Sequence, residues 1–397
     1  MVCYGVEIKA KEMGLIILEN LEPAPTMKVP KDFRPGVQYE GNEGTATTEG
    51  LAEQPNFDEF LLERGYPPEE YEIIGTPRTS QWQQREGGDY LTSYRFTFRK
   101  KVADLDLPAL FSVAKRTKSA VTRRKAKVSE KALIICPADF QVGKGASRGG
   151  HEELIARVFE SFGKIETQMK QGYERIYILD MGDIIESFDS KAKFEQVQSN
   201  TLSPMQQTDL AASLMFELIK LAAKYAPVTY GSIASNHCQN RFMGQAVGKP
   251  GLDDWGIVIL QQLRRLTTEI GMNVDYLIPQ PDDEGFAFQY GVNTIGAVHG
   301  HQAARPAGVK KWWSDASFGN QWASACDVLI SAHFHHLAIE ELGQRHDGNG
   351  SKFWVQCPTS DNGSDWFRRK SGQDSSTGIL TMELDKHTPF SGTVTKQ

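Results

Sequence analysis

Long apolar runs and clustered cysteines are both missing from this sequence of 397 residues. No stretch is apolar over the roughly 20 residues that a membrane-spanning helix needs, and no basic start leads into an apolar signal segment. The five cysteines (Cys3, Cys136, Cys238, Cys326 and Cys357) lie far apart and form no C-x-x-C pair. This spacing argues against a disulfide framework and against a zinc knuckle. We therefore expect a cytoplasmic protein without membrane association.

An overall excess of positive charge is also missing, because the formal net charge is -6. Residues 115–131 are a local exception, with eight lysines and arginines and one acid, Glu130. The segment has no aromatic residues and little apolar periodicity, which is typical of a solvated linker. A basic linker can also bind a phosphate backbone, since lysine and arginine displace its condensed counterions. Both interpretations stay open on the sequence alone.

The basic segment divides the chain into parts of different composition. Residues 1–50 include a Pro-, Gly-, Thr- and Glu-rich stretch that is too polar to fold alone, so we expect a flexible segment. Residues 51–113 combine helical spacing with the two-residue alternation of a half-buried strand, which predicts a small α+β module. This module is interpreted either as a DNA-contacting wing or as a packing or dimerisation element. Residues 114–130 form the linker, and residues 131–397 form the main domain.

The main domain alternates apolar runs with helical patterns. Runs at 132–136, 176–179 and 228–233 have strand character, and helical faces lie between them at 154–169 and 210–219. This alternation predicts βαβ crossovers and a parallel sheet. Ligand sites in such sheets gather beyond the carboxyl ends of the strands.

Five short polar motifs lie at those strand ends. They are Asp139-Phe140-Gln141, Gly182-Asp183-Ile184-Ile185-Glu186, Ser235-Asn236-His237, Val298-His299-Gly300-His301 and Ser331-Ala332-His333-Phe334-His335. They supply carboxylate, amide and imidazole groups, which are ligands for divalent metals. Each motif alone is weak evidence, but their order predicts a two-metal site of the kind that hydrolyses phosphate esters.

Residues 131–370 resemble the calcineurin-like metallophosphoesterases. The D-x-Q form of the first motif and the tail at 361–369 are more similar to phage- and actinobacteria-associated members described as DNA-repair exonuclease-like. The resemblance implies an α/β fold, a four-layer α/β/β/α metallophosphoesterase sandwich with a small N-terminal α+β module. Two divalent metals would lie at one edge of this sandwich.

The resemblance also implies a role for each motif. The first metal would be bound by Asp139, Gln141 and His335, the second by Asn236, His299 and His333, and Asp183 would bridge both. His237 would assist the leaving group, with Glu186 orienting its ring. A hydroxide activated by the metals would attack phosphorus in line. Mixed oxygen and nitrogen ligands favour Mn²⁺, with Fe, Ni or Zn as alternatives.

Further residues are candidates for contacting the substrate. They are His301, Lys144, Arg148, Trp313, Arg368 and Arg369. The alternative interpretations are that His301 supports a metal ligand from behind, that Lys144 and Arg148 are solvated loop charges, and that Trp313 belongs to the core. The implied substrate is DNA, with a partner ATPase or a homodimer as further expectations and, for a phage-encoded chain, the host cytoplasm as its location.

Two departures from the family pattern keep other functions open. Gln141 stands where many relatives have histidine, and an amide binds transition metals less tightly than imidazole does. Cys238 follows His237 where relatives have an acid. A phosphatase or phosphodiesterase for nucleotides and other small esters is the first alternative. A DNA- or protein-binding component with a weakened metal site is the second.

Overall fold

The computed structural model describes residues 33–40, 43–83, 87–101, 106, 108, 112, 129–187, 199–363, 368 and 376–397. The chain divides into two compact units after Lys101. Most of the basic segment and Arg369 lie outside the described residues. Within the described residues, no helix is long and apolar enough to cross a membrane.

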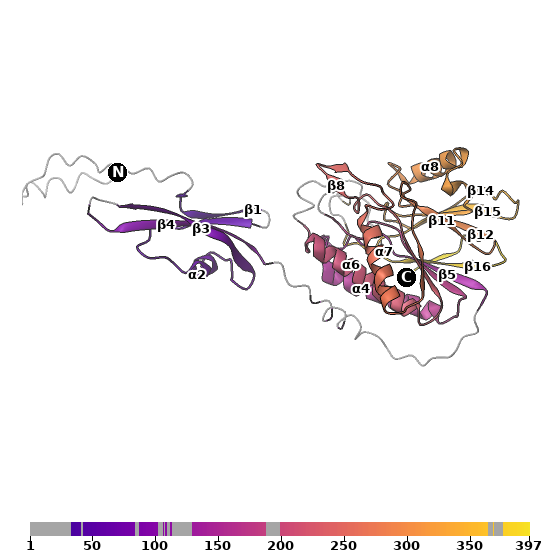
Figure 1. Ribbon diagram of the computed structural model, residues 1–397, viewed down its shortest axis with the longest axis horizontal. Helices are drawn as coiled ribbons and strands as arrows, with labels where there is room; N and C mark the ends of the chain where they lie inside the picture. The colour runs from indigo at the N-terminus through magenta and orange to yellow at the C-terminus, as the bar shows by residue number, and fades with distance from the viewer. Residues whose placement is uncertain are drawn as a thin grey trace, which may run out of the picture. The chain divides into compact units, whose positions relative to one another are not determined.

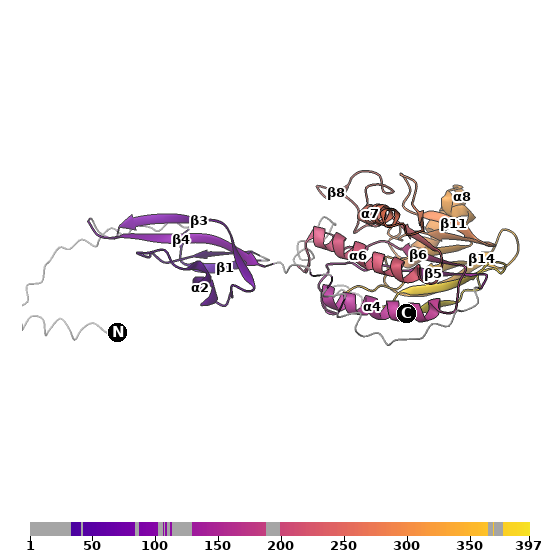
Figure 2. The ribbon, with the colours of Figure 1, turned by 60° about the horizontal axis from the view of Figure 1, so that its bottom comes forward.

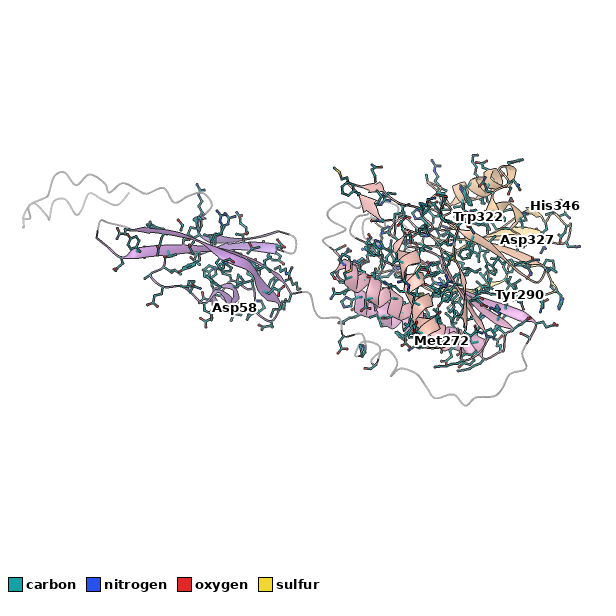
Figure 3. All side chains as sticks on the ribbon, viewed as in Figure 1. Asp58, Met272, Tyr290, Trp322, Asp327 and His346 are labelled. Atoms are coloured by element: carbon teal, nitrogen blue, oxygen red, sulfur yellow. The ribbon has the colours of Figure 1, made fainter. Side chains whose placement is uncertain are left out.

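The first unit is a four-stranded antiparallel sheet with one short helix (Figure 1). Its elements are β1 (Gly36–Glu40), β2 (Glu43–Thr47), α2 (Phe57–Leu62), β3 (Tyr71–Gln83) and β4 (Tyr90–Lys100). Asn56 caps α2, because its side-chain oxygen accepts from the N–H groups of Asp58 and Glu59. Asp58 is labelled on this helix in Figure 3. The core of the unit is aromatic, with Phe96 and Phe98 buried against Leu61.

Strands β1 and β2 differ from the expectation of a flexible segment over residues 1–50. Residues 36–40 and 43–47 pair with each other, and β2 also pairs along β4. Their polar composition gave no alternation to recognise. Pairing with β4 provides the hydrogen-bonding partners that this segment lacks by itself. The small α+β module therefore begins before residue 51.

The second unit contains two sheets packed between helices. The six-stranded sheet has the order β10-β7-β6-β5-β16-β17, and the five-stranded sheet has the order β11-β12-β13-β15-β14. The strands are β5 (Lys131–Cys136), β6 (Arg175–Asp180), β7 (Val228–Ser232), β10 (Val274–Leu277), β11 (Phe286–Tyr290), β12 (Asn293–Ala297), β13 (Val328–Ser331), β14 (Ala338–Gln344), β15 (Ser351–Gln356), β16 (Leu380–Asp385) and β17 (Val394–Lys396). The helices are α4 (His151–Met169), α6 (Pro204–Ala222), α7 (Trp255–Glu269), α8 (Pro306–Phe318) and the short 3-10 helix η2 (Trp322–Ala325), and β8 (Arg241–Phe242) and β9 (Gln245–Ala246) form a hairpin.

Burial on both faces of β5 explains the layered order. Leu133 and Ile135 pack against α4, α6 and α7, whereas Ile134 faces the five-stranded sheet and meets Ile295 and Ile330. A strand covered on both faces needs a continuous apolar run, as this one has. Helix α8 covers the outer face of the five-stranded sheet through a separate apolar cluster. Figures 1 and 2 show the resulting α/β/β/α sandwich, and Figure 3 shows side chains filling the space between its layers.

The strand directions confirm the expected parallel core. Strands β10, β7, β6 and β5 run parallel to one another, and β12, β13 and β15 do so in the second sheet. The helices between them begin at defined caps. Ser203 and Gln206 form a reciprocal capping box at α6, and Asp254 caps α7 by accepting from Gly256 and Ile257. The carboxyl ends of the strands that precede the five motifs therefore meet at one edge.

Candidate metal centre

Both sheets deliver polar side chains to this edge. Asp139 and Gln141 follow β5, Asp183 follows β6, and Asn236 follows β7. The two histidine motifs follow β12 and β13, which are parallel neighbours. The sandwich thus brings all five sequence motifs into one site, although they span almost 200 residues of the chain.

The backbone of this site is strained. Among the described residues, eight non-glycine residues have positive φ, and five of them are the proposed ligands Asp139, Gln141, Asp183, His333 and His335. Residues other than glycine rarely adopt this left-handed backbone conformation, and it persists only where the surrounding structure holds it. Concentration at a single cluster of carboxylate, amide and imidazole groups indicates a functional site rather than chance strain.

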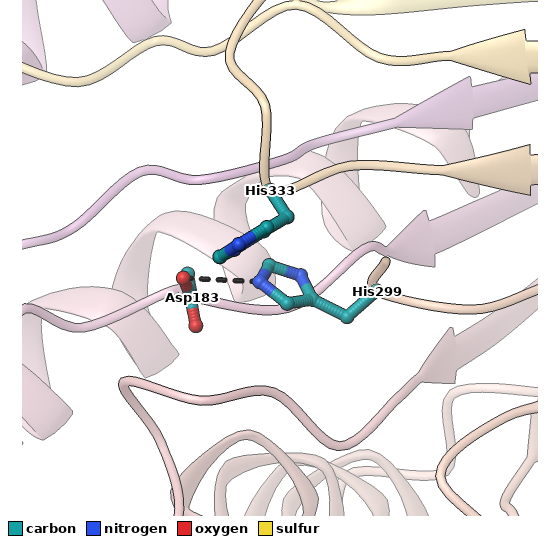
Figure 4. Close-up of side chains that lie close together, drawn as sticks. All are labelled: Asp183, His299 and His333. Atoms are coloured by element: carbon teal, nitrogen blue, oxygen red, sulfur yellow. Dashed lines mark ion pairs between the residues drawn. The ribbon is translucent and has the colours of Figure 1, made fainter. Parts of the chain in front are cut away.

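Four residues form what we call the His299 site: Asp183, Asn236, His299 and His333. The Nε2 atom of His299 lies 3.0 Å from Oδ2 of Asp183 and 3.1 Å from Oδ1 of Asn236. One ligand atom from each of Asp183, His299 and His333 lies within 4.8 Å of the others. Figure 4 shows the carboxylate and the two rings turned toward one another.

The donors of the His299 site fit a divalent cation. Nδ1 of His299 donates to the carbonyl of Met181 at 2.8 Å, which directs Nε2 into the site. Burial lowers the pKa of His299, but the charge of Asp183 outweighs it and raises the pKa to about 9. The Nε2 proton therefore occupies a position between two oxygen acceptors that a metal ion can take. Burial, aided by the charge of His299, lowers the pKa of His333 to about 4, which keeps this ring neutral and able to bind metal.

Asp183 is a buried carboxylate that its neighbours hold in place. Burial raises its pKa, but the nearby charges of His299 and His237 outweigh burial and hold the pKa well below its usual range. Its Oδ1 atom accepts from the N–H of His237 at 2.9 Å, and its own N–H donates to Oγ of Ser235 at 2.7 Å. A buried, ionised and fixed carboxylate suits the bridging role that the sequence indicates.

The second set, which we call the Asp139 site, comprises Asp139, Gln141 and His335, and the sequence predicts that it shares Asp183. Oδ1 of Asp139 is buried without a hydrogen-bond partner, and Nε2 of His335 lies 3.3 Å from it. An orphaned carboxylate oxygen beside an imidazole fits a cation. Gln141 differs from the expectation, because its Oε1 atom already accepts from Nζ of Lys144 at 2.5 Å.

His237 and Glu186 lie beside both sites. Nδ1 of His237 is 3.0 Å from the backbone carbonyl of Glu186 and 3.5 Å from its carboxylate. Nε2 of the same ring is 3.4 Å from Nε2 of Gln141 and 4.0 Å from Oδ2 of Asp183. Glu186 thus fixes one edge of the ring while the other edge points toward the metal ligands.

Several predicted substrate residues also lie near the site. His301 pairs with Glu284 at 3.5 Å, and its ring centroid is 5.5 Å from that of His299. Lys144 and Arg148 both lie near Asp361, at 2.8 and 3.9 Å. Arg368 belongs to the described part of the chain, and its contact with a substrate stays a prediction.

Trp313 requires a correction. Its indole is buried in the apolar cluster beneath α8, and its Nε1 atom donates to the carbonyl of Ala323 at 2.8 Å. A ring enclosed in this way has no free face for a base to stack on. The sequence could not decide this, because the same Trp-Trp pair suits a core as well as a surface.

Cys238 does not have the chemical properties of a metal ligand. Its side chain is part of the core between the helices and the six-stranded sheet, and burial raises the pKa of its thiol well above the usual value. A neutral, enclosed thiol is a poor metal ligand and a poor target for oxidation. Its presence after His237 is therefore a packing feature.

Asp361 is the residue that the sequence analysis left without a role. It follows β15 and is buried, with Oδ2 2.8 Å from Lys144 and 3.5 Å from Nδ1 of His335. Burial raises its pKa, but the charges of His335 and Lys144 outweigh burial and lower it. The rule that ligands follow strand ends would have found this residue, since β15 is parallel to β13.

Comparisons with known proteins give weak likenesses. No protein-family model and no curated protein matches the sequence. Similar solved structures include a mutant Vps29 from Entamoeba histolytica, with 13% identity, 64% of this chain and 87% of that chain covered, and a TM-score of 0.28. They also include a purple acid phosphatase from yellow lupin seeds, with 10% identity, 88% and 69% coverage, and a TM-score of 0.32. A structure of PhoD shares 9% identity over 91% and 88% of the two chains, with a TM-score of 0.31. Because these scores are low, the function is inferred from the site itself.

Proposed function

We propose that this protein is a metal-dependent phosphodiester hydrolase that acts on DNA. One observation carries the proposal: two sets of carboxylate, amide and imidazole groups lie at the carboxyl ends of two sheets, one around the buried Asp183 and the other around the buried Asp139. Five of these ligands occupy a strained left-handed backbone conformation. Such sites bind divalent cations for chemistry on phosphate esters.

In the proposed reaction, the ligands hold the divalent cations and fix their geometry. When bound, divalent cations at these sites supply positive charge to the phosphoryl oxygens and lower the pKa of a water molecule toward neutrality. The shared Asp183 and the orphaned Oδ1 of Asp139 carry the negative charge that holds the cations. The histidines fix the geometry, because His299 is anchored by Met181 and His335 by Asp361.

His237 is placed to assist the leaving group. Its Nδ1 atom faces Glu186, so its Nε2 edge, which is directed toward Gln141 and Asp183, would carry the proton to the leaving oxygen. Its side chain is partly exposed, which leaves room for a substrate to reach it. Glu186 is a positioning residue, because it contacts Nδ1 of the His237 ring and would not contact the substrate. A positioned acid of this kind contributes roughly 10²–10⁴-fold to the rate.

Residues other than the metal ligands favour DNA as the substrate. The basic segment at 115–131 can track a phosphate backbone. Arg148, His301 and His335 retain partial exposure at the site, which is compatible with an extended substrate. We propose Mn²⁺ as the native ion, because the mixed oxygen and nitrogen ligands include no thiolate. A partner ATPase or a second copy of the chain is a further part of this proposal.

The test is hydrolysis by the full chain with Mn²⁺, and in parallel with Fe²⁺, Ni²⁺ and Zn²⁺. The substrates are bis-p-nitrophenyl phosphate, p-nitrophenyl phosphate and labelled single- and double-stranded DNA. We expect the diester and DNA to be cleaved. His237→Ala should retain bound metal and lose at least roughly 10²-fold in turnover, whereas Asp183→Ala should lose metal and turnover together. His346→Ala is the matched control, because this histidine is exposed on the loop between β14 and β15 (Figure 3).

Each other outcome has a defined meaning. Cleavage of the monoester alone would make the protein a phosphatase for small substrates. Bound metal without turnover on any substrate would favour a binding component. Full activity of His237→Ala would overturn the role given to this residue while leaving the metal ligands in place.

A further inference from the structure

Lys144 lies inside the Asp139 site rather than at its rim. Its Nζ atom is 2.5 Å from Oε1 of Gln141 and 2.8 Å from Oδ2 of Asp361. Only 12% of its side chain is exposed. The oxygen that Lys144 contacts on Gln141 is the atom through which this residue would bind a metal ion.

The position of Lys144 is fixed by the backbone around it. Nδ2 of Asn362 donates to the carbonyl of Lys144 at 2.5 Å and to that of Gly150 at 2.8 Å. The N–H of Arg148 donates to the carbonyl of Asn362 at 3.0 Å. The loop that carries Lys144 is therefore clamped on the loop after β15, and the ammonium group is a built part of the site.

An ammonium ion and a divalent cation compete for this position. Both seek oxygen atoms, and two positive charges that share one amide oxygen repel each other strongly in a buried site. Within the described residues, the oxygens of Asp183 and Asn236 at the His299 site contact Nε2 of His299 and the N–H of His237, and no lysine. The two metal positions are thus chemically unequal, although they share Asp183.

We propose that Lys144 is a resident cation of the Asp139 site, so that the protein binds one divalent ion tightly at the His299 site and a second only weakly. The buried carboxylate of Asp361 also contacts the ammonium group and holds Lys144 in place. The second ion enters fully only when the ammonium group withdraws from Oε1 of Gln141. This inference rests on the proposed metal-dependent function.

Metal counting on the full chain tests the proposal. Each protein is loaded with Mn²⁺, desalted and analysed for bound manganese, and the second binding step is measured by calorimetry. We expect one retained ion per wild-type chain. Lys144→Met and Lys144→Gln should bind the second ion at least about 10-fold more tightly, because a repelling charge is removed. The glutamine variant can still donate to Asp361, so it serves if the methionine variant does not fold.

Arg148→Met is the matched control. It removes a positive charge that lies 3.9 Å from Asp361, farther than the 2.8 Å of Lys144. The control should still retain one ion, whereas a general effect of charge would change both variants alike. Electron paramagnetic resonance gives a second readout. A single Mn²⁺ gives an isolated six-line spectrum, and two neighbouring ions in Lys144→Met should give a coupled one.

Two results would overturn the proposal. Two ions held equally tightly by the wild type would show that Lys144 excludes neither of them, and DNA cleavage in the same preparation would leave the proposed function standing. An unchanged second binding step in both Lys144 variants would have the same meaning. Failure of every chain to bind Mn²⁺ would contradict the proposed function as well.

Discussion

At the scale of single residues, the site depends on close approach between loops that are far apart in the sequence. Gly182 shows this most clearly, since it has φ +87° and precedes the shared ligand Asp183. A Cβ atom at this position would lie 2.6 Å from Cβ of Ser235 and 2.7 Å from Nδ1 of His299. The glycine thus leaves room for the ring that is anchored on Met181.

Gly182→Ala is therefore expected to damage the His299 site. The left-handed conformation alone should lower the free energy of unfolding by about 1–3 kcal/mol, and displacement of His299 should weaken Mn²⁺ binding. Gly163→Ala is the matched control, because nothing lies within 4 Å of a Cβ added there inside α4. The control should raise the free energy of unfolding by about 1 kcal/mol. Urea unfolding and calorimetry measure both effects, and equal Mn²⁺ affinity in the two variants would contradict the explanation.

At the scale of elements, the start of α7 supports the metal loop. Oδ1 of Asp254 accepts from the N–H groups of Gly256 and Ile257, and Oδ2 accepts from the N–H of Ser235 at 3.0 Å. Ser235 in turn accepts from Asp183 and precedes the ligand Asn236. One buried side chain therefore joins a helix cap to two of the proposed ligands.

Asp254→Ala should lower both stability and metal affinity. Loss of the cap costs about 1 kcal/mol, and leaving a buried N–H without a partner adds roughly 1–3 kcal/mol. Ser203→Ala removes the N-cap of α6. The side chain of Ser203 accepts from the N–H of Gln206, so this substitution should lower the free energy of unfolding by about 1 kcal/mol and leave Mn²⁺ binding unchanged. Thermal unfolding with and without Mn²⁺ separates the two variants. A similar loss of Mn²⁺ affinity in both would mean that α7 has no special link to the site.

At the scale of the whole molecule, every proposed metal ligand lies in the second unit. The first unit has its own aromatic core and its own sheet. The chemistry and any DNA contact by the basic segment can therefore be separated by truncation. The second unit should keep the metal sites, since β5 begins at Lys131.

Deletion of residues 1–130 is expected to preserve Mn²⁺ binding and hydrolysis of bis-p-nitrophenyl phosphate. DNA binding should weaken, and its dependence on salt should become shallower, because seven of the eight basic side chains of the segment are removed. Fluorescence anisotropy at two salt concentrations measures this. Unchanged affinity for DNA would remove the nucleic-acid role of the basic segment, although the hydrolytic site would be unaffected.

The sequence by itself determined the parallel strands and the kinds of ligand at their ends. Asp139, Asp183, Asn236 and His299 could be found because each follows a short apolar run, and strand ends meet at one edge for topological reasons. The start of the first unit was missed, since β1 and β2 gain their order from pairing with β4.

Only the tertiary structure decided how the side chains share their partners. It buried the indole of Trp313 between α8 and the five-stranded sheet, placed Asp361 beside His335, and brought Lys144 to the side-chain oxygen of Gln141. The place of Lys144 depends on Asp361, which lies 217 residues further along the chain, and the burial of Trp313 depends on which face of α8 is covered. Local periodicity carries no information about either, so the candidate ligands could be predicted from the chain, whereas the partners of their side chains could not.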